Sequence, residues 1–494
     1  MKRLFTLLIS IGISTIAFAQ YNQQHPKLTA TGLPASASFG GSVSLSDDAS
    51  IAIVGAWGGT NGATGQAVIM NRNGSIWTQG QTLVGSGAIG GANQGNSVAV
   101  SGDGNTAIIG GPNDNNGAGA AWIFVKNGTT WTEQTKLVGT GATGNAWQGF
   151  SVAISADGNT VIVGGPQNNT HVGAAWVFTR SGTTWTQQAM LQGSDAVSSS
   201  SYPSEQGYCV AMSSDGSTAL VGGRFDGGAK GAAWFYARNG NSWTQQGGKA
   251  TGSTLQPIGT SVALSANGNV AVIGAAAADS KTGGAFVVTR TGSTWTPYSS
   301  ILQGTLPVGK AQQGGSVDIS NDGKTVVMGG AASIFTPNSG DIGIGSTWIF
   351  KYDGSNWNQE GNKYVGTGNS GNSQQGGSVS ISADGNTFVT GGFGDNNFNG
   401  AVWVFSKTIP PTTSVNRLSR MSARVYPNPV NNTMHIDSDQ PIYTELIALD
   451  GKVVIKKTTN KSLDVSNLPA NMYFLNCYNL EGQLLHTEKI IKSK

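Results

Sequence analysis

Apolar and polar residues alternate in short runs along most of the chain. Between residues 148 and 193, four such runs follow one another and read SVAIS, TVIVGG, AAWVFTR and WTQQAML. Asp157-Gly158 separates the first two runs, and Ser181-Gly182 separates the last two. Because glycine accepts the positive φ of a tight turn, both dipeptides are typical of β-hairpins. The segment is therefore predicted to form a four-stranded antiparallel sheet, with strands A to D in chain order.

The same pattern recurs at intervals of 52 to 62 residues. One glycine opens each copy, and these glycines are Gly40, Gly95, Gly149, Gly207, Gly259, Gly314 and Gly376. A single sheet of this size cannot bury both of its faces, whereas sheets stacked radially around an axis can. We therefore expect residues 20–407 to form an all-β domain, a seven-bladed β-propeller. An aromatic residue recurs in strand C, as in Trp122 and Trp176, and is expected to pack between blades.

The last copy of the pattern lacks its strand D, because it ends at Ser406-Lys407. The segment from Tyr21 to Gly32 is similar to WTEQTKLVGTG at residues 131–141, with one extra residue. We therefore predict that residues 27–31 pair with residues 401–407. An N-terminal strand would then close the propeller and cover a sheet edge that otherwise invites aggregation.

The first 19 residues are typical of a secretory signal peptide. Lys2 and Arg3 precede an apolar run that ends in Ala17-Phe18-Ala19, a small-x-small cleavage site. The mature chain is then expected to begin at Gln20. The alternative, a membrane anchor, agrees less well with the run, which is shorter than the ~20 residues that span a bilayer. An exported protein without a transmembrane segment is predicted.

Composition and charge narrow the function further. Charged residues make up 11% of the chain, against roughly 25% in typical globular domains, and the net charge is +3. Basic runs with interleaved aromatic residues are missing from the sequence, so no nucleic-acid partner is expected. The two cysteines, Cys209 and Cys477, fall in different predicted domains, which favours two buried thiols over a disulfide.

The repeats resemble the FG-GAP family, whose repeat also builds the propeller of integrin α-chain heads. The resemblance rests on Phe39-Gly40-Gly41-Ser42 and on Gly110-Gly111-Pro112 and Gly164-Gly165-Pro166. It implies a propeller fold and, in many members, calcium in the A–B turn. Here each such turn offers one carboxylate, whereas calcium takes about six to eight oxygen ligands. We expect no cofactor and interpret these aspartates as turn formers, with calcium as the alternative: Asp103, Asp157, Asp215, Asp322 and Asp384.

Strand direction places the B–C loops and the D-to-A crossings on one face of the predicted propeller. This face varies most between copies, and its longest segments are residues 331–345 and 194–205. Recognition sites usually lie on such variable loops. Aromatic and arginine side chains that break the repeat are the candidate ligand-binding residues there, namely Trp57, Trp147, Tyr202, Arg224, Phe225, Phe335, Phe393 and Phe398. They could stack on sugar rings or anchor a protein, or they could pack over the blade ends.

Signals for catalysis are weak. His171 is the one histidine expected on the variable face, which argues against a histidine-rich zinc site and against a Ser-His-Asp site. A pair of carboxylates for glycoside cleavage stays open, because the B–C loops carry Asp114, Asp226, Asp279, Asp341 and Asp395. Asp318 occupies a strand A position that is alanine or serine elsewhere and is expected to point toward the channel. No catalytic residue and no metal ligand is predicted.

Residues 408–423 contain Pro410-Pro411 and are expected to be a linker. Residues 424–494 are predicted to form a small C-terminal β-sandwich. Residues 426–429 (YPNP), 449–453 (LDGKV), 468–473 (LPANMY) and the lysine-containing end at 489–494 resemble the type A C-terminal sorting domain of the type IX secretion system. The resemblance implies contact with the secretion machinery, passage through the outer membrane, and release or surface attachment. A generic binding sandwich is the alternative.

These observations together predict a secreted or surface-attached binding or adhesion protein without enzymatic activity. Its propeller would recognise a glycan or a protein through the variable face. Two alternatives stay open: a polysaccharide hydrolase or lyase on the same scaffold, and a structural surface component with no discrete ligand.

Overall fold

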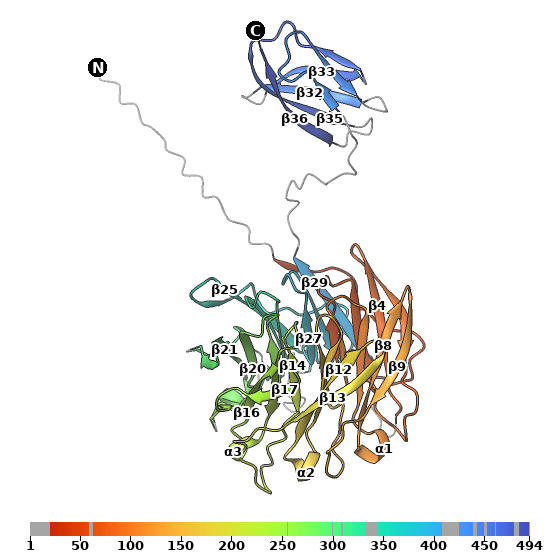
Figure 1. Cartoon of the computed structure of the whole chain (residues 1–494), viewed down its shortest axis with the longest axis vertical. Coiled ribbons are helices and arrows are strands. Elements are labelled where there is room, and N and C mark those ends of the chain that lie inside the picture. The colour runs from red at the N-terminus through yellow and green to blue at the C-terminus, as the bar shows by residue number, and fades with distance from the viewer. Residues whose placement is uncertain are drawn as a thin grey trace, which may run out of the picture. The chain divides into compact units, whose positions relative to one another are not determined.

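The structure is a computed structural model of the chain. It describes residues 20–58, 63–253, 255–298, 300–307, 310–331, 343–407, 424–437, 442–448, 452–459, 461–478 and 484–493. The predicted signal peptide and the predicted linker lie outside these residues. The chain divides into two compact units, Met1–Thr408 and Ile409–Lys494, and each is described by itself (Figure 1).

The described part of the first unit is all-β and propeller-like. Its strands form seven antiparallel sheets. The first three sheets are β2 (Val43–Leu45), β3 (Ile51–Ala56), β4 (Gln66–Asn73) and β5 (Ile76–Leu83); β6 (Ser97–Val100), β7 (Thr106–Gly111), β8 (Ala120–Asn127) and β9 (Thr130–Leu137); and β10 (Ser151–Ile154), β11 (Thr160–Gly165), β12 (Ala174–Ser181) and β13 (Thr184–Leu191).

The outer strands of the next three sheets are shorter or interrupted. These sheets are β14 (Cys209–Met212), β15 (Thr218–Gly223), β16 (Ala232–Asn239) and β17 (Ser242–Gln245), with β18 (Ala250–Thr251) also on β16; β19 (Val262–Leu264), β20 (Val270–Gly274), β21 (Ala285–Thr291) and β22 (Thr294–Pro297); and β23 (Ser316–Ile319), β24 (Thr325–Gly330), β25 (Ser346–Tyr352) and β26 (Trp357–Gln359). The seventh sheet has the order β1 (Tyr21–Gln23), β29 (Ala401–Lys407), β28 (Thr387–Gly392) and β27 (Ser378–Ile381).

Neighbouring sheets pack through their innermost strands. In the order β2, β6, β10, β14, β19, β23 and β27, each strand contacts the next, and β27 in turn contacts β2. Glycine makes the approach possible, because a Cβ added to Gly110 or Gly164 would lie 2.0 or 2.2 Å from a backbone oxygen of the following crossing. The recurring tryptophans of strand C are fully buried between sheets, so the prediction that they form core is confirmed: Trp122, Trp176, Trp234, Trp348 and Trp403.

The chain start pairs with the last strand of the first unit, but over a different stretch from the one predicted. Tyr21 pairs with Lys407 and Gln23 with Phe405, whereas of residues 27–31 only Leu28 forms a bridge, to Val402. The predicted pairing of residues 27–31 is therefore wrong in extent. Pro26 explains the difference, since it lacks a backbone N–H and separates the strand from the bridge.

Tight one-turn elements connect strand B to strand C in five sheets. They are α1 (Asp114–Gly117), α2 (Asn168–His171), α3 (Asp226–Ala229), α4 (Ala278–Lys281) and α5 (Asp395–Phe398). Their central residues have left-handed dihedral angles, for example φ 49° at Asn115 and φ 57° at Asn116. Asparagine and glycine adopt this region most readily, which accounts for their abundance in these loops.

The second unit contains two sheets. One has the order β30 (Arg424–Tyr426), β31 (Thr433–Asp437) and β34 (Ser462–Asp464), and the other β33 (Val453–Thr459), β32 (Ile442–Ala448), β35 (Asn471–Tyr478) and β36 (Leu484–Lys492). Met434, Ile436, Leu446 and Leu475 form its core with Cys477. Cys209 and Cys477 are both free thiols, and Cys477 is buried whereas Cys209 is partly buried. Within the described residues, no helix has the length and apolar character needed to cross a membrane.

Candidate functional site

The crossings that lead from one sheet into the next hold the candidate residues in place. Each crossing runs beside the preceding B–C loop, as in the parallel bridges Gly119 to Gln148 and Gly173 to Gln206. The residue before the bridge has a positive φ, 58° at Trp147 and 52° at Glu205. The equivalent residues Ser38, Asn93, Gln312 and Gln374 share this angle, so it belongs to the repeat and is not strain peculiar to one site.

A buried glutamine fixes five of these crossings, and Phe39 and Ile258 stand at its position in the other two. The Gln148 side chain accepts a hydrogen bond from the Gly139 N–H and donates one, of 2.9 Å, to the Gly139 carbonyl. Gln94, Gln313 and Gln375 make the same pair of bonds to Gly85, Gly304 and Gly366. These reciprocal bonds satisfy the polar groups on both sides, which explains why glutamine replaces the family's phenylalanine here.

Five side chains form a connected group, the aromatic–arginine cluster, at the starts of β10 and β14 and the end of β15. The Trp147 and Phe150 rings lie 6.0 Å apart, and the Phe150 and Tyr208 rings 5.1 Å apart. The Arg224 guanidinium carbon lies 4.1 Å from the Tyr208 ring centre and 4.5 Å from that of Phe225. A guanidinium held between two rings is pre-organised to present its remaining N–H donors to a ligand.

Polar contacts orient the arginine further. Its Nε donates to Glu205 Oε2 at 2.6 Å, and its Nη1 donates to the Tyr208 hydroxyl at 3.1 Å. The Arg224 side chain remains 35% exposed, whereas Glu205 is 12% exposed. Burial raises the pKa of the Tyr208 phenol, and it raises the pKa of the neighbouring Cys209 thiol to about 12. Both groups therefore stay protonated near neutral pH, and the cluster offers stacking and hydrogen bonding without a reactive thiolate.

The other candidate residues lie apart from this cluster. Trp57 packs over Gly41, where an added Cβ would lie 2.5 Å from the indole nitrogen. The ring centres of Phe393 and Phe398 lie 6.3 Å apart. Tyr202 is 47% exposed on its crossing, and Phe335 lies outside the described residues.

Of the eight residues proposed from sequence, the structure brings together Trp147, Arg224 and Phe225. The sequence analysis missed Phe150, Tyr208 and Glu205. Their position in the sequence could have identified them, because they flank the Gln-Gly dipeptides at places where the residue type varies between copies.

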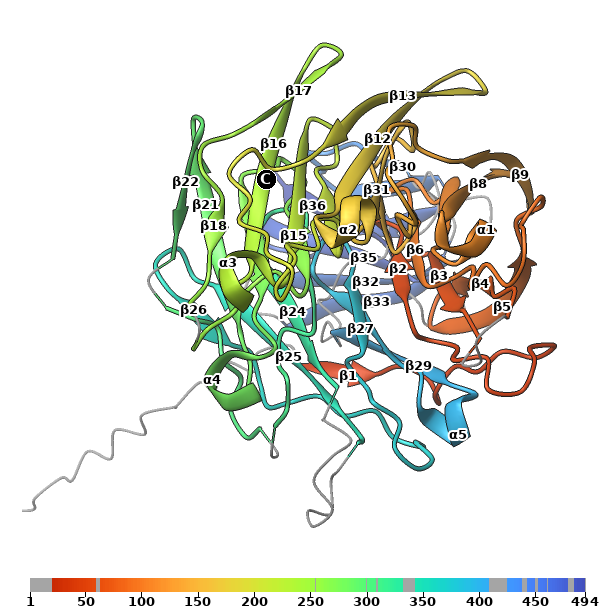
Figure 2. The same cartoon turned by 90° about the horizontal axis from the view of Figure 1, so that it is seen from below.

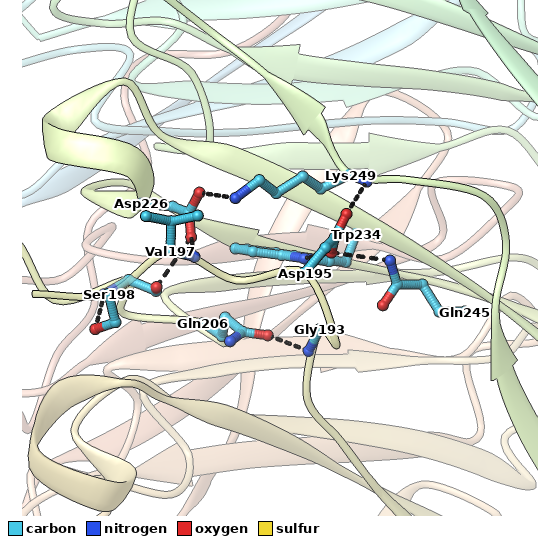
Figure 3. A network of polar contacts seen from close by, with 10 residues as sticks. Gly193, Asp195, Val197, Ser198, Gln206, Asp226, Trp234, Gln245 and Lys249 are labelled. Atoms are coloured by element: carbon cyan, nitrogen blue, oxygen red, sulfur yellow. Dashed lines mark hydrogen bonds and ion pairs between the residues drawn. The ribbon is translucent and has the colours of Figure 1, made fainter.

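Three of the B–C loop aspartates hold the loops together, and Figure 3 shows one of them, Asp226, beside Lys249 and Val197. Asp114 is buried, pairs with Lys136 at 2.7 Å and accepts the Ile89 N–H. Asp226 likewise pairs with Lys249 and accepts the Val197 N–H. Asp395 pairs with Lys27 at 2.5 Å and accepts the Ser370 N–H. Each carboxylate therefore ties a loop, an outer strand and a crossing to one another.

The remaining two aspartates do not extend this arrangement. Asp279 is exposed, and Asp341 lies outside the described residues. The loop carboxylates therefore do not converge on one point in the described part of the chain.

The aspartates of the A–B turns bond to their own turn. Asp157 Oδ1 accepts the Ser155 hydroxyl and the Asn159 N–H, the latter at 2.9 Å. Partial burial acts against ionisation, but these hydrogen bonds outweigh it and hold the pKa of Asp157 below its usual value. Among the described residues, no group of three His, Cys, Asp or Glu side chains is placed to hold a metal ion.

Asp318 also bonds to backbone. Its carboxylate accepts the N–H groups of Ile319 and Ile381 and the hydroxyl of Ser380, at 2.8 to 3.1 Å. The Ser380 hydroxyl oxygen in turn accepts the Leu45 N–H. Asp318 thus connects β23 to β27 and, through Ser380, to β2 at the start of the unit.

Comparison with known proteins supports both parts of the sequence interpretation. Residues 23–69 match the family described as FG-GAP repeat, and residues 424–493 match the family described as Secretion system C-terminal sorting domain. The chain carries an FG-GAP repeat and a type IX sorting domain. The sorting domain indicates secretion or a location at the outer surface, and it implies contact with the secretion machinery.

Solved structures resemble the chain at low sequence identity. Hydrazine synthase of Kuenenia stuttgartiensis is 13% identical, with a TM-score of 0.48, and the match covers 77% of this chain and 99% of that one. A candidate 6-phosphogluconolactonase from Bacteroides uniformis is 11% identical, with a TM-score of 0.47, and the match covers 87% and 96%. A search of curated proteins found no match.

Proposed function

We propose that this chain is an exported binding or adhesion protein whose first unit is a seven-bladed propeller closed by its own N-terminal segment. The succession of innermost strands from β2 to β27 and back to β2 supports this arrangement, as does the pairing of Tyr21–Gln23 with β29. Cleavage after Ala19 would leave Gln20 as the first residue, one position before β1 begins.

The ligand is proposed to be a glycan or a protein, bound at the aromatic–arginine cluster. The observation that carries this proposal is the half-exposed Arg224, held between two aromatic rings and oriented by Glu205. Binding hot spots at interfaces are enriched in tryptophan, tyrosine and arginine, and an arginine already held by neighbouring side chains loses less freedom when it binds a ligand. Stacking on an aromatic ring serves a sugar equally well.

The test is a binding screen of the mature chain, residues 20–494, against a glycan array and an array of purified extracellular proteins. Each hit is then repeated with Arg224→Gln and with Arg72→Gln. Arg72 is a matched control, because it also lies over an aromatic ring, Trp77, in the outer hairpin of the first sheet. We expect Arg224→Gln to weaken binding at least about tenfold, which corresponds to about 1.4 kcal/mol, and Arg72→Gln to leave it unchanged.

Three results would contradict the proposal. Hits retained equally by both variants would place recognition elsewhere on the molecule. A chain that binds nothing on either array would instead favour the structural surface component. Turnover of an arrayed polysaccharide would favour the hydrolase or lyase alternative.

A further inference from the structure

Five of the junctions between neighbouring sheets are filled by a recurring pair of side chains. One member ends or follows the outer strand of one sheet, and it packs in the same core cluster as the strand C tryptophan of the next sheet. The pairs are Leu83 with Trp122, Leu137 with Trp176, Leu191 with Trp234, Leu302 with Trp348 and Tyr364 with Trp403. All of these side chains are buried, so the junctions are solid where the pair is complete.

One junction departs from this rule at both positions. Ala250 pairs with Ala233 as Leu137 pairs with Ala121, so alanine stands where the repeat has leucine. Phe286 pairs with Ile273 as Trp122 pairs with Ile109, so phenylalanine stands where the repeat has tryptophan. Both are only partly buried. Close-packed interiors leave a void when side chains are shortened in this way, unless the surroundings collapse.

The void is present as an open cleft of about 580 Å³ between β16–β18 and β21–β22. These strands lie on the same side of the unit in Figure 2. Ala250, Ile258, Ile273, Phe286 and Trp295 line it, with Tyr298 at its edge. The volume falls within the roughly 300–1,000 Å³ of small-molecule sites, and an apolar lining with a few polar groups is their usual composition.

A second substitution of the same kind is surrounded by larger neighbours. Val68 replaces the strand C tryptophan in the first sheet, but it packs with Leu28 and the fully buried Phe39 in one core cluster. The shortened pair is thus compensated at that junction. At the junction of Ala250 and Phe286, Ile258 stands at the position of Phe39 and is a smaller side chain.

The polar groups of the cleft indicate which ligand it suits. In four of the five complete junctions the indole nitrogen donates to the carbonyl three residues after the leucine or tyrosine of the pair, as Trp122 does to Ser86 at 2.7 Å and Trp176 to Thr140 at 2.9 Å. Trp234 instead donates to the Asp195 carboxylate. The corresponding residue here is Ser253, which lines the cleft. Its carbonyl accepts the Gln256 N–H at 3.2 Å, and Phe286 has no N–H to offer to its second lone pair. Lys249 also lines the cleft, but its ammonium is paired with Asp226.

We propose that this cleft is a binding site for an uncharged aromatic ligand of about the size of an indole, with one hydrogen-bond donor directed at the Ser253 carbonyl. The apolar floor takes the place that leucine and the indole ring fill at the other junctions. The paired Lys249 leaves no free charge to favour an anion. This site is separate from the aromatic–arginine cluster, and neither proposal depends on the other.

The experiment uses 5-fluoroindole as the probe and follows its fluorine NMR line width with the mature chain. We expect broadening with the wild-type chain and at least tenfold weaker binding to Ala250→Leu, which restores the side chain of the repeat. Phe286→Trp is the second variant, and it fills the cleft from the other wall if Ala250→Leu does not fold. Leu306→Ala is the matched control, because Leu306 is an exposed apolar residue on a different crossing, and it is expected to bind the probe as the wild type does.

The proposal is overturned if 5-fluoroindole binds the wild type and both filled variants equally, since the probe would then sit elsewhere. It is also overturned if no broadening occurs with the wild type at millimolar probe. If Ala250→Leu keeps the hits that the wild type gives on the glycan or protein arrays, filling the cleft does not impair binding at the aromatic–arginine cluster. The two proposals can then be judged separately.

Discussion

Single polar residues decide much of the architecture of the first unit. Gln148 and its equivalents hold the crossings, Asp157 and its equivalents shape the A–B turns, and Asp318 connects β23 to β27. Gln148, Asp157 and Asp318 are each surrounded by hydrogen-bonding partners. The same chemistry makes Asp318 a sensitive reporter of packing, because its carboxylate is hydrogen-bonded and the residue is partly buried.

Asp318 should make the stability of the first unit depend on pH. Desolvation by the surrounding protein raises its pKa to about 6, against hydrogen bonds that lower it, whereas an unfolded aspartate titrates near 3.9. Between these values the folded chain binds more protons than the unfolded chain, so the Asp318 contribution to the free energy of unfolding is lost as pH rises from about 4 to about 6. Asp318→Ala is expected to abolish that loss, measured by urea unfolding across this range.

Asp353→Ala provides a control of opposite sign. Hydrogen bonds from Asn356 and Ser355 lower the pKa of this exposed carboxyl. Its contribution is therefore present above the unfolded pKa and lost as pH falls below it. If the free energy of unfolding depends on pH in the same way for the wild type and for Asp318→Ala, the raised pKa of Asp318 is contradicted.

The residues of the site were harder to foresee than the turns. Trp147 and Arg224 stand out in the sequence because they break the repeat, and the structure places both in the aromatic–arginine cluster. Phe150 and Tyr208 occupy a position that holds asparagine, threonine or glycine in other copies, and their meeting depends on how two crossings face each other. Trp57 and Phe393 break the repeat equally well, yet they pack separately over Gly41 and Gly377.

At the scale of elements, the pattern of apolar and polar residues predicts the strands well and the crossings between sheets poorly. Alternation of apolar residues predicts strands, and Asp-Gly or Ser-Gly predicts the turns between them. The left-handed B–C turns and the glutamine contacts follow from hydrogen bonds between segments distant in sequence, which periodicity does not report. In the same way, Pro26 limits the N-terminal strand. The N-terminal segment still takes the place of a strand D, but the strand lies at Tyr21–Gln23 and not at residues 27–31.

Gln148→Leu should destabilise the first unit. Leucine fills a similar volume but leaves the N–H and the carbonyl of Gly139 buried without their side-chain partner. Each such group costs about 1–3 kcal/mol, so we expect a loss of about 2–4 kcal/mol in the free energy of unfolding, measured by urea denaturation. Gln192→Leu is the control, because Gln192 is exposed and makes one side-chain bond, to the Gly173 carbonyl, which water can replace; a change within about 0.5 kcal/mol is expected. Equal effects of the two substitutions would show that the buried contact is not what fixes the crossing.

At the scale of the whole molecule, the account rests on a first unit whose two ends meet. Tyr21 is buried against Tyr364 and Phe388, and the Lys407 ammonium lies 4.8 Å from its ring centre. Arg180 and Arg290 make the same contact with Trp185 and Trp295 in complete sheets. Tyr21 therefore occupies the place of the strand D tryptophan. In the proposed closed ring, the B–C loops and crossings share one face, and the aromatic–arginine cluster belongs to the proposed recognition surface on it.

Disulfide trapping of the chain start against β29 tests this claim most directly. Asn22 is the register partner of Ser406, and paired residues in antiparallel strands lie within the Cα separation that a disulfide accepts. We predict that Asn22→Cys/Ser406→Cys oxidises to an intramolecular disulfide, seen as a mobility shift on non-reducing electrophoresis, whereas Asn22→Cys/Ser181→Cys does not. If the first pair stays reduced under conditions that oxidise free thiols, or if both pairs form equally, the closed seven-bladed ring is contradicted.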